Sequence, residues 1–212
     1  MQFLTQILSF FLHIDTHLGS ILQEYGLFTY VILFLIVVCE TGLVVTPFLP
    51  GDSLLFAAGA FAARGSMDVV LLFFLFWIAS ILGDALNYSI GRRIGESVYS
   101  WRSRWVSHEH LERTRRFFLV YGGMTIVIAR FMPIVRTFAP FVAGVGKMPI
   151  RTFMTYNIAG GLLWVTLFVG GGYFFGTLPF VEKNFSVVIL AIIVLSVMPG
   201  VVMWIRKRVQ SV

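Results

Sequence analysis

Four apolar runs, each about as long as the hydrocarbon core of a bilayer is thick, constrain this chain more than any other feature. The runs extend over residues 28–46, 69–90, 152–175 and 185–205. A helix needs about 20 apolar residues to cross that core. Of all residues, 58% are hydrophobic and 12% are charged, whereas soluble domains carry about 25% charged residues. The sequence therefore predicts an all-α integral membrane protein.

The charged residues of the chain exclude several other classes of protein. The net charge of +6 could suggest a nucleic-acid partner, but the basic residues cluster in short segments beside the apolar runs, so they are interpreted as topology signals. Cys39 is the only cysteine, which excludes an internal disulfide framework. The first 25 residues contain no Lys or Arg, so no cleavable signal peptide is expected.

Two segments, about 47–65 and 118–147, are apolar but broken by prolines and glycines. Each is too interrupted to form a single crossing, so each is predicted to enter the membrane and return as a re-entrant helical hairpin. Between them, residues 92–116 are rich in arginine and are predicted to form an amphipathic segment on the cytoplasmic surface. With re-entrant hairpins, most of the Lys and Arg residues fall on the cytoplasmic side, as the positive-inside rule requires.

The domain layout follows from these segments. Residues 1–26 alternate apolar and polar residues at roughly helical spacing and predict an interfacial amphipathic helix. Residues 27–206 form a single transmembrane domain, and residues 207–212 form a basic cytoplasmic tail.

The two broken segments resemble each other in sequence. Residues 47–59 read PFLPGDSLLFAAG and residues 133–144 read PIVRTFAPFVAG. The similarity extends into the apolar runs that follow, where Ile78-Ala79-Ser80 of the first run matches Ile158-Ala159-Gly160 of the second. Because one crossing separates the two units, an inverted-topology repeat with a site near the bilayer midplane is expected. Chance similarity between apolar sequences is the alternative.

Four ionisable residues lie in or beside the broken segments: Glu40, Asp52, Arg130 and Arg136. A charge at membrane depth costs at least about 2.5–3.5 kcal/mol, so each of these groups needs a partner or a wet cavity. Both arginines flank Pro133, where a helix break lets them converge. A guanidinium binds phosphate through two parallel hydrogen bonds, so the arginines are predicted to bind an anionic headgroup.

The carboxylates differ from the arginines because they can take up and release protons. Glu40 and Asp52 are therefore the predicted proton-coupling residues, and protonation and substrate binding would compete for the same arginines. The alternative is a structural ion-pair network that holds the hairpins together. Asp52 could also serve as a helix N-cap. Further residues are predicted either to line the cavity or to form hydrogen bonds between helices, and these are Asp84, Asn87, Ser53 and Thr137.

The sequence offers little support for an enzyme. His13, His17, His108 and His110 all fall in predicted surface segments, which leaves none beside the buried charges to act as a base or metal ligand. No nucleotide-binding glycine loop occurs, which excludes an ATP-driven pump within this chain. No cofactor or metal is expected.

Two segments of the chain resemble those of a known family. Glu40 together with Phe48-Leu-Pro-Gly-Asp52, and the segment from Arg130 to Gly144, are similar to the two signature segments of the DedA family of bacterial membrane proteins. The resemblance covers about residues 25–205. It implies two facing re-entrant hairpins in a multi-pass protein of the bacterial inner membrane. It also implies roles in proton motive force, envelope integrity and the return of undecaprenyl phosphate or other phospholipids across the bilayer.

The leading functional prediction is proton-coupled translocation of an anionic lipid, with undecaprenyl phosphate first and phosphatidylethanolamine second. One alternative is a proton antiporter for small cations or drugs. Another is an assembly or envelope-integrity factor that transports nothing. The expected partners are membrane lipids and protons, and the glycines at 170–172 would permit close helix contact in a homo-oligomer.

Overall fold

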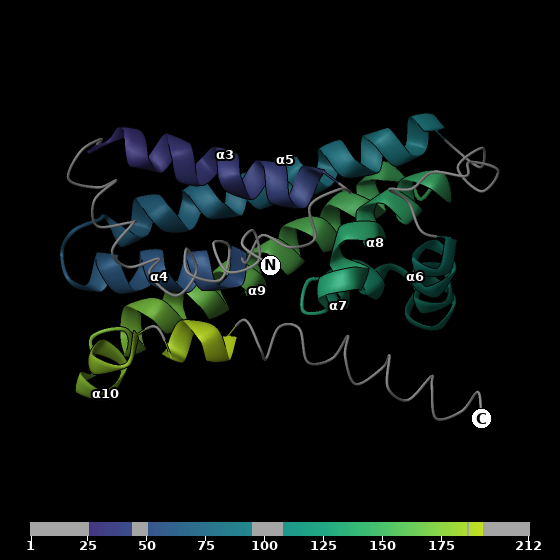
Figure 1. Ribbon diagram of the computed structural model, residues 1–212. Coiled ribbons are helices and arrows are strands. Elements are labelled where there is room, and N and C mark those ends of the chain that lie inside the picture. Colours follow the sequence, from purple (N-terminus) through teal and green to yellow (C-terminus); the bar gives the residue numbers. More distant parts are fainter. Residues whose placement is uncertain (1–25, 44–50, 95–107, 186, 193–212) are drawn as a thin grey trace, which may run out of the picture. The chain divides into compact units, whose positions relative to one another are not determined.

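A computed structural model describes residues 26–43, 51–94, 108–185 and 187–192 (Figure 1). Every regular element among these residues is helical, which confirms the all-α class for this part of the chain. Residues 187–192 are helical. The other elements are α3 (Phe28–Gly42), α4 (Gly51–Ala63), α5 (Val69–Ile94), α6 (His108–Tyr121), the 3₁₀ helix η2 (Gly122–Met124), α7 (Thr125–Ala129), α8 (Pro133–Val145), α9 (Ile150–Phe175) and α10 (Pro179–Lys183).

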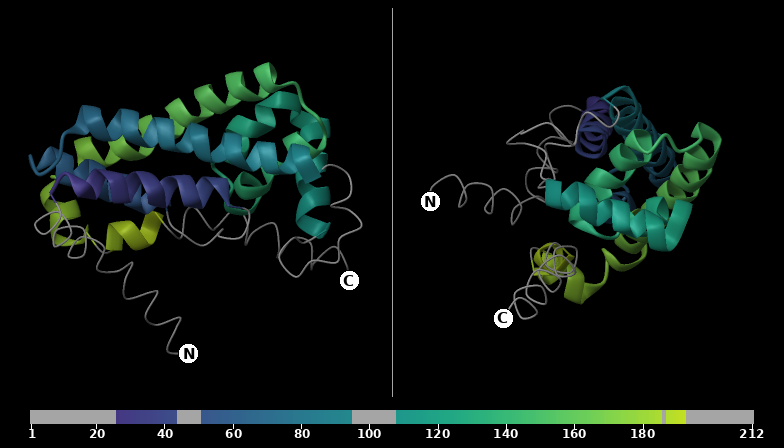
Figure 2. Two further views of the ribbon diagram at one scale, coloured as in Figure 1. Left: turned by 90° about the horizontal axis from the view of Figure 1, so that it is seen from above. Right: turned by 90° about the vertical axis from the view of Figure 1, so that its right-hand side faces the viewer.

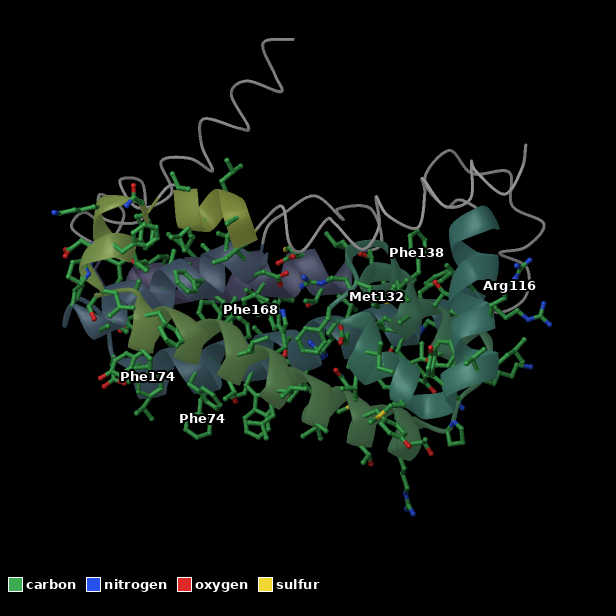
Figure 3. All side chains as sticks on the ribbon, turned by 90° about the horizontal axis from the view of Figure 1, so that it is seen from below. Phe74, Arg116, Met132, Phe138, Phe168 and Phe174 are labelled. Carbon is green, nitrogen blue, oxygen red and sulfur yellow. The ribbon has the colours of Figure 1, made fainter. Side chains whose placement is uncertain are left out.

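Two helices, α5 and α9, are long and apolar enough to cross a membrane, each with 26 residues. They correspond to two of the four predicted apolar runs. The first run appears as α3, with 15 residues, and only the beginning of the fourth lies within the described residues. Phe74 of α5 and Phe174 of α9 extend outward from their helices (Figure 3) and are 49% and 73% exposed. Such large exposed apolar side chains suit a lipid-facing surface.

The predicted helix breaks are present at the prolines. α4 begins at Gly51, directly after Pro50, and α8 begins at Pro133. Proline suits the first turn of a helix because its missing N–H would have no partner there. Re-entry into the membrane remains a prediction for both segments, and the predicted N-terminal helix and basic tail lie outside the described residues.

Two helices lie at the edges of the predicted segments. Helix α6 runs from the predicted surface segment 92–116 into the predicted hairpin, because it continues to Tyr121 before η2 and α7 follow. Between the third and fourth apolar runs lies the short helix α10, which starts at Pro179. Proline at a helix start fixes φ near its helical value, and this explains the extra turn.

The described residues divide into two compact units. Unit 1 contains residues 26–35, 51–76, 165–185 and 187–192, and unit 2 contains residues 36–43, 77–94 and 108–164. Helices α3, α5 and α9 thus contribute residues to both units.

In unit 1, α4 packs against the C-terminal part of α9 through glycines. A Cβ atom added at Gly59 would lie 2.3 Å from the carbonyl oxygen of Val169. A Cβ atom added at Gly172 would lie 2.0 Å from the carbonyl oxygen of Phe56. The two backbones therefore touch, and only glycine fits at these positions.

In unit 2, α8 packs against the C-terminal part of α5 in the same way. A Cβ atom at Gly144 would lie 2.1 Å from the carbonyl oxygen of Tyr88. One at Gly91 would lie 2.2 Å from the carbonyl oxygen of Phe141. In each unit, the short helix has a phenylalanine three residues before its glycine, and the carbonyl oxygen of that phenylalanine meets a glycine of the long apolar helix. An internal repeat predicts such matching contacts.

The core of unit 2 forms where α6 and α7 pack against α8 (Figure 2). The ring of Tyr88 stacks on that of Phe153 at 4.3 Å between centroids, and Ile126, Ala129 and Val135 are buried around them. This packing holds the ends of α7 and α8, which carry Arg130 and Arg136.

Candidate functional site

An ion pair between a buried carboxylate and a partly buried arginine joins α8 to α3 in unit 2. The Nη2 atom of Arg136 lies 3.3 Å from Oε1 of Glu40. The Glu40 side chain is 5% exposed and that of Arg136 15%. The Arg136 guanidinium also lies 5.0 Å from the ring centroid of Trp164 on α9, within the range of a cation–π contact. Side chains from three helices therefore meet at Arg136.

A second ion pair, between two buried side chains, lies at the end of α7. Arg130 caps that helix, and its Nη2 atom lies 2.5 Å from Oδ2 of Asp84 on α5. The same nitrogen donates a hydrogen bond of 2.5 Å to Oδ1 of Asn157 on α9. Asn157 in turn donates from Nδ2 to the carbonyl oxygen of Ile81, at 3.1 Å. The amide thus links α5 and α9 while it accepts a hydrogen bond from the arginine.

Gly160 leaves room for Arg130. A Cβ atom at this position would lie 3.1 Å from Nε of Arg130 and 3.2 Å from the backbone of Val127. The Nε atom is buried and makes no hydrogen bond with the described residues. A buried donor of this kind costs free energy unless a water or ligand satisfies it.

Asn87 on α5 connects the helices that carry the Glu40–Arg136 pair. Its Nδ2 atom donates to the carbonyl oxygens of Thr41, at 3.3 Å, and Thr137, at 2.9 Å. Thr41 follows Glu40 and Thr137 follows Arg136 in the chain. One buried amide therefore fixes the backbone beside both partners of the ion pair.

Comparisons with known proteins establish the family. Residues 49–174 match the family of the VTT domain. The chain is 52% identical to Protein DedA of Escherichia coli strain K12 over 211 residues, which is 98% of this chain and 96% of that protein. The chain belongs to the DedA family of membrane proteins. No solved structure matches it.

Other DedA relatives match over most of their length. An uncharacterized membrane protein of Mycobacterium leprae is 38% identical over 83% of this chain and 80% of its own length. The inner membrane protein YqjA of Escherichia coli strain K12 is 35% identical over 84% of this chain and 85% of its own length. The DedA resemblance drawn from the two signature segments is thus confirmed.

Six of the predicted site residues of this DedA family protein lie in unit 2, within or beside the two ion pairs. Glu40 contacts Arg136, as an acid and an arginine were expected to do. Arg130 pairs with Asp84, which the sequence placed only among the candidate cavity residues. The side chain of Asn87 donates a hydrogen bond to the carbonyl oxygen of Thr137. The six are Glu40, Asp84, Asn87, Arg130, Arg136 and Thr137.

Asp52 and Ser53 belong to unit 1, in the first turn of α4, and both are buried. Asp52 follows Gly51, the first residue of the helix, so it lies inside the first turn. A negative side chain there is favoured by the positive end of the helix dipole. Its role in proton coupling remains a prediction.

Sequence reasoning missed Asn157 and Trp164. Asn157 is the only amide in the run 152–175, and a polar group inside an apolar helix signals a hydrogen-bonding role. Trp164 lies in the middle of the same run, whereas tryptophans at membrane depth usually lie near the ends. Both signals were readable from the sequence.

Proposed function

We propose that this DedA family protein translocates an anionic lipid across the membrane in a proton-coupled cycle, in which the lipid and a proton are bound at the same time. The proposal rests on two ion pairs among the described residues of unit 2: the partly buried Arg136 contacts the buried Glu40, and the buried Arg130 contacts the buried Asp84. Arginine keeps its charge under all conditions, whereas a carboxylate can be neutralised by a proton. The carboxylates are therefore the replaceable partners.

The exchange follows from the cost of an unpaired buried charge. When Glu40 takes up a proton, the Arg136 guanidinium loses its counter-charge, and a lipid phosphate that enters the site supplies a new one. Release of that proton makes Glu40 compete for Arg136 again and expels the phosphate. Trp164 keeps its contact with the guanidinium during the exchange, because a cation–π contact does not depend on the carboxylate.

Several features favour a lipid as the substrate. The arginines offer the forked geometry that fits phosphate, and the buried Nε of Arg130 is a further donor. Large apolar side chains on α5 and α9 are exposed and suit contact with acyl or prenyl chains. We propose undecaprenyl phosphate as the first candidate and phosphatidylethanolamine as the second. We also propose that this protein is a multi-pass protein of the bacterial inner membrane, and the name of the relative YqjA, an inner membrane protein, supports this location.

A transport assay tests the proposal. The purified protein is reconstituted into liposomes with a fluorescent polyprenyl phosphate, and its movement between leaflets is followed with and without a pH gradient. The wild type is expected to move the lipid faster under the gradient. Glu40→Gln is expected to lose this acceleration, because the amide cannot exchange a proton. Glu182→Gln is the matched control, since Glu182 is exposed on α10 in unit 1.

Two other outcomes would contradict the proposal. Movement of small cations without movement of lipid would identify a proton antiporter. Movement of neither, from protein that is folded by size-exclusion chromatography, would favour the non-transporting assembly factor.

A further inference from the structure

A cavity lies outside the ion-pair site, in unit 2 between α6 and the C-terminal end of α8. Its volume is about 660 Å³, within the range of about 300–1,000 Å³ that is usual for small-molecule sites. Most of its lining is apolar, with a single charged side chain. The lining residues are Arg115, Phe118, Val142, Ala143, Val145, Gly146, Met148 and Pro149.

The cavity adjoins the ends of both long apolar helices. Its wall at 146–149 leads directly into α9, which begins at Ile150 and carries Arg151 as its second residue. Near the end of α5, Ile90 and Ile94 pack against the cluster that contains the lining residues Val142 and Val145. Arg92 and Arg93 lie in the last turn of the same helix. Basic side chains at the ends of apolar helices lie at the depth of the lipid headgroups. We therefore expect the cavity to open where phosphates and the first acyl carbons meet.

The wall of the cavity after α8 is held in place by hydrogen bonds. The backbone N–H of Met148 donates to the carbonyl oxygen of Ala143, at 2.9 Å. The hydroxyl of Tyr88 donates to the carbonyl oxygen of Met148, at 2.5 Å. Lys147 adopts a left-handed backbone conformation, with φ 54°, and its side chain is exposed. The turn is thus a preformed wall, and it carries an exposed cation between Gly146 and Met148, two of the lining residues.

We propose that this cavity binds an anionic phospholipid, with one acyl chain against Phe118 and Val142 and the phosphate against Arg115. The apolar lining suits a chain and excludes a bare anion from the interior. The guanidinium suits a phosphate, and Lys147 adds attraction for lipids with net negative charge. The bound lipid would fasten α6 to the membrane surface. This site uses no residue of the two ion pairs and does not depend on the proposed function.

A pair of neighbouring arginines provides the test. Arg115 lines the cavity, whereas Arg116 extends outward from α6 (Figure 3) and does not. Both are exposed, so Arg115→Gln and Arg116→Gln remove the same charge. Full-length protein is transferred from mixed micelles of phosphatidylglycerol and phosphatidylcholine, and retained lipid is counted by native mass spectrometry. The wild type and Arg116→Gln are expected to retain phosphatidylglycerol in preference, and Arg115→Gln is expected to lose that preference.

A second variant tests the acyl-chain part of the cavity. Gly146 is exposed, and a Cβ atom there would contact only backbone oxygens, the nearer at 3.3 Å. Gly146→Leu is therefore expected to fold, to fill the cavity and to reduce retained phosphatidylglycerol while Arg115 is intact. An equal loss of retained phosphatidylglycerol in Arg115→Gln and Arg116→Gln would overturn the proposal. It would show that the lipid is attracted by the overall positive charge of α6 and not by a site at Arg115. Full displacement of the lipid by inorganic phosphate, or unchanged retention in Gly146→Leu, would overturn the acyl-chain site.

Discussion

Replacement of Asp84 by alanine is expected to lower the free energy of unfolding by about 3–5 kcal/mol, because it leaves the charge of Arg130 buried without its carboxylate. The side chains of the pair are only 5% and 7% exposed, so water cannot replace the lost partner. Asn157 would still accept a hydrogen bond from Arg130, but an amide supplies no counter-charge. The loss is measured as reduced thermal stability: the protein is heated in detergent, and size-exclusion chromatography then measures the fraction that remains folded.

A double variant separates stability from function. Replacing both partners, as in Asp84→Leu with Arg130→Met, removes the buried charges together and is expected to recover most of the lost stability. It leaves Asn157 without its donor, a residual cost of about 1–3 kcal/mol. Transport is expected to be absent in the double variant even though it is stable, because it lacks the Arg130 guanidinium. If the single and double variants were equally unstable, the pair would not be coupled in the way that its geometry indicates.

Gly144→Ala is expected to destabilise unit 2 by an amount at the upper end of about 1–3 kcal/mol, the usual range for overpacking. The added methyl group would lie 2.1 Å from the carbonyl oxygen of Tyr88 and 2.7 Å from the backbone nitrogen of Arg92. Backbone atoms cannot rotate away as a side chain does, so α8 must move from α5. Gly59→Ala is expected to cause a similar loss in unit 1, because its methyl group would meet the backbone of Val169.

Gly170→Ala is the matched control for both glycine variants. Gly170 lies within α9, and nothing lies within 4 Å of the added methyl group. Alanine favours the helix over glycine by up to about 1 kcal/mol, so this variant is expected to be as stable as the wild type or slightly more stable. Equal stability of Gly144→Ala and Gly170→Ala, in the same heating assay, would contradict the close contact between α8 and α5.

The sequence predicted well what depends on local patterns. The apolar runs predicted α5 and α9, and the prolines predicted where α4 and α8 begin. The pairing of a buried acid with a buried arginine followed from the cost of isolated charges. These features depend only on neighbouring residues or on the solvent.

Which carboxylate pairs with Arg130 could not be predicted, because no local sequence pattern carries that information. Asp84 lies far along the chain from Arg130, and their contact depends on how α5 and α7 are oriented in the packed unit. The sequence therefore ranked Asp52 above Asp84, because Asp52 stands beside a helix break. The bridge that Asn87 makes to two backbone carbonyls was equally out of reach, because backbone acceptors have no sequence signature.

If Glu40 and a lipid phosphate exchange places at Arg136, lipid binding must be accompanied by proton uptake. Purified protein in weakly buffered detergent solution is titrated with a short-chain polyprenyl phosphate while a pH indicator records proton uptake. The wild type is expected to take up protons as it binds the lipid, and Glu40→Gln is expected to bind the lipid with reduced proton uptake. Binding to the wild type without proton uptake, or undiminished uptake by Glu40→Gln, would contradict the exchange.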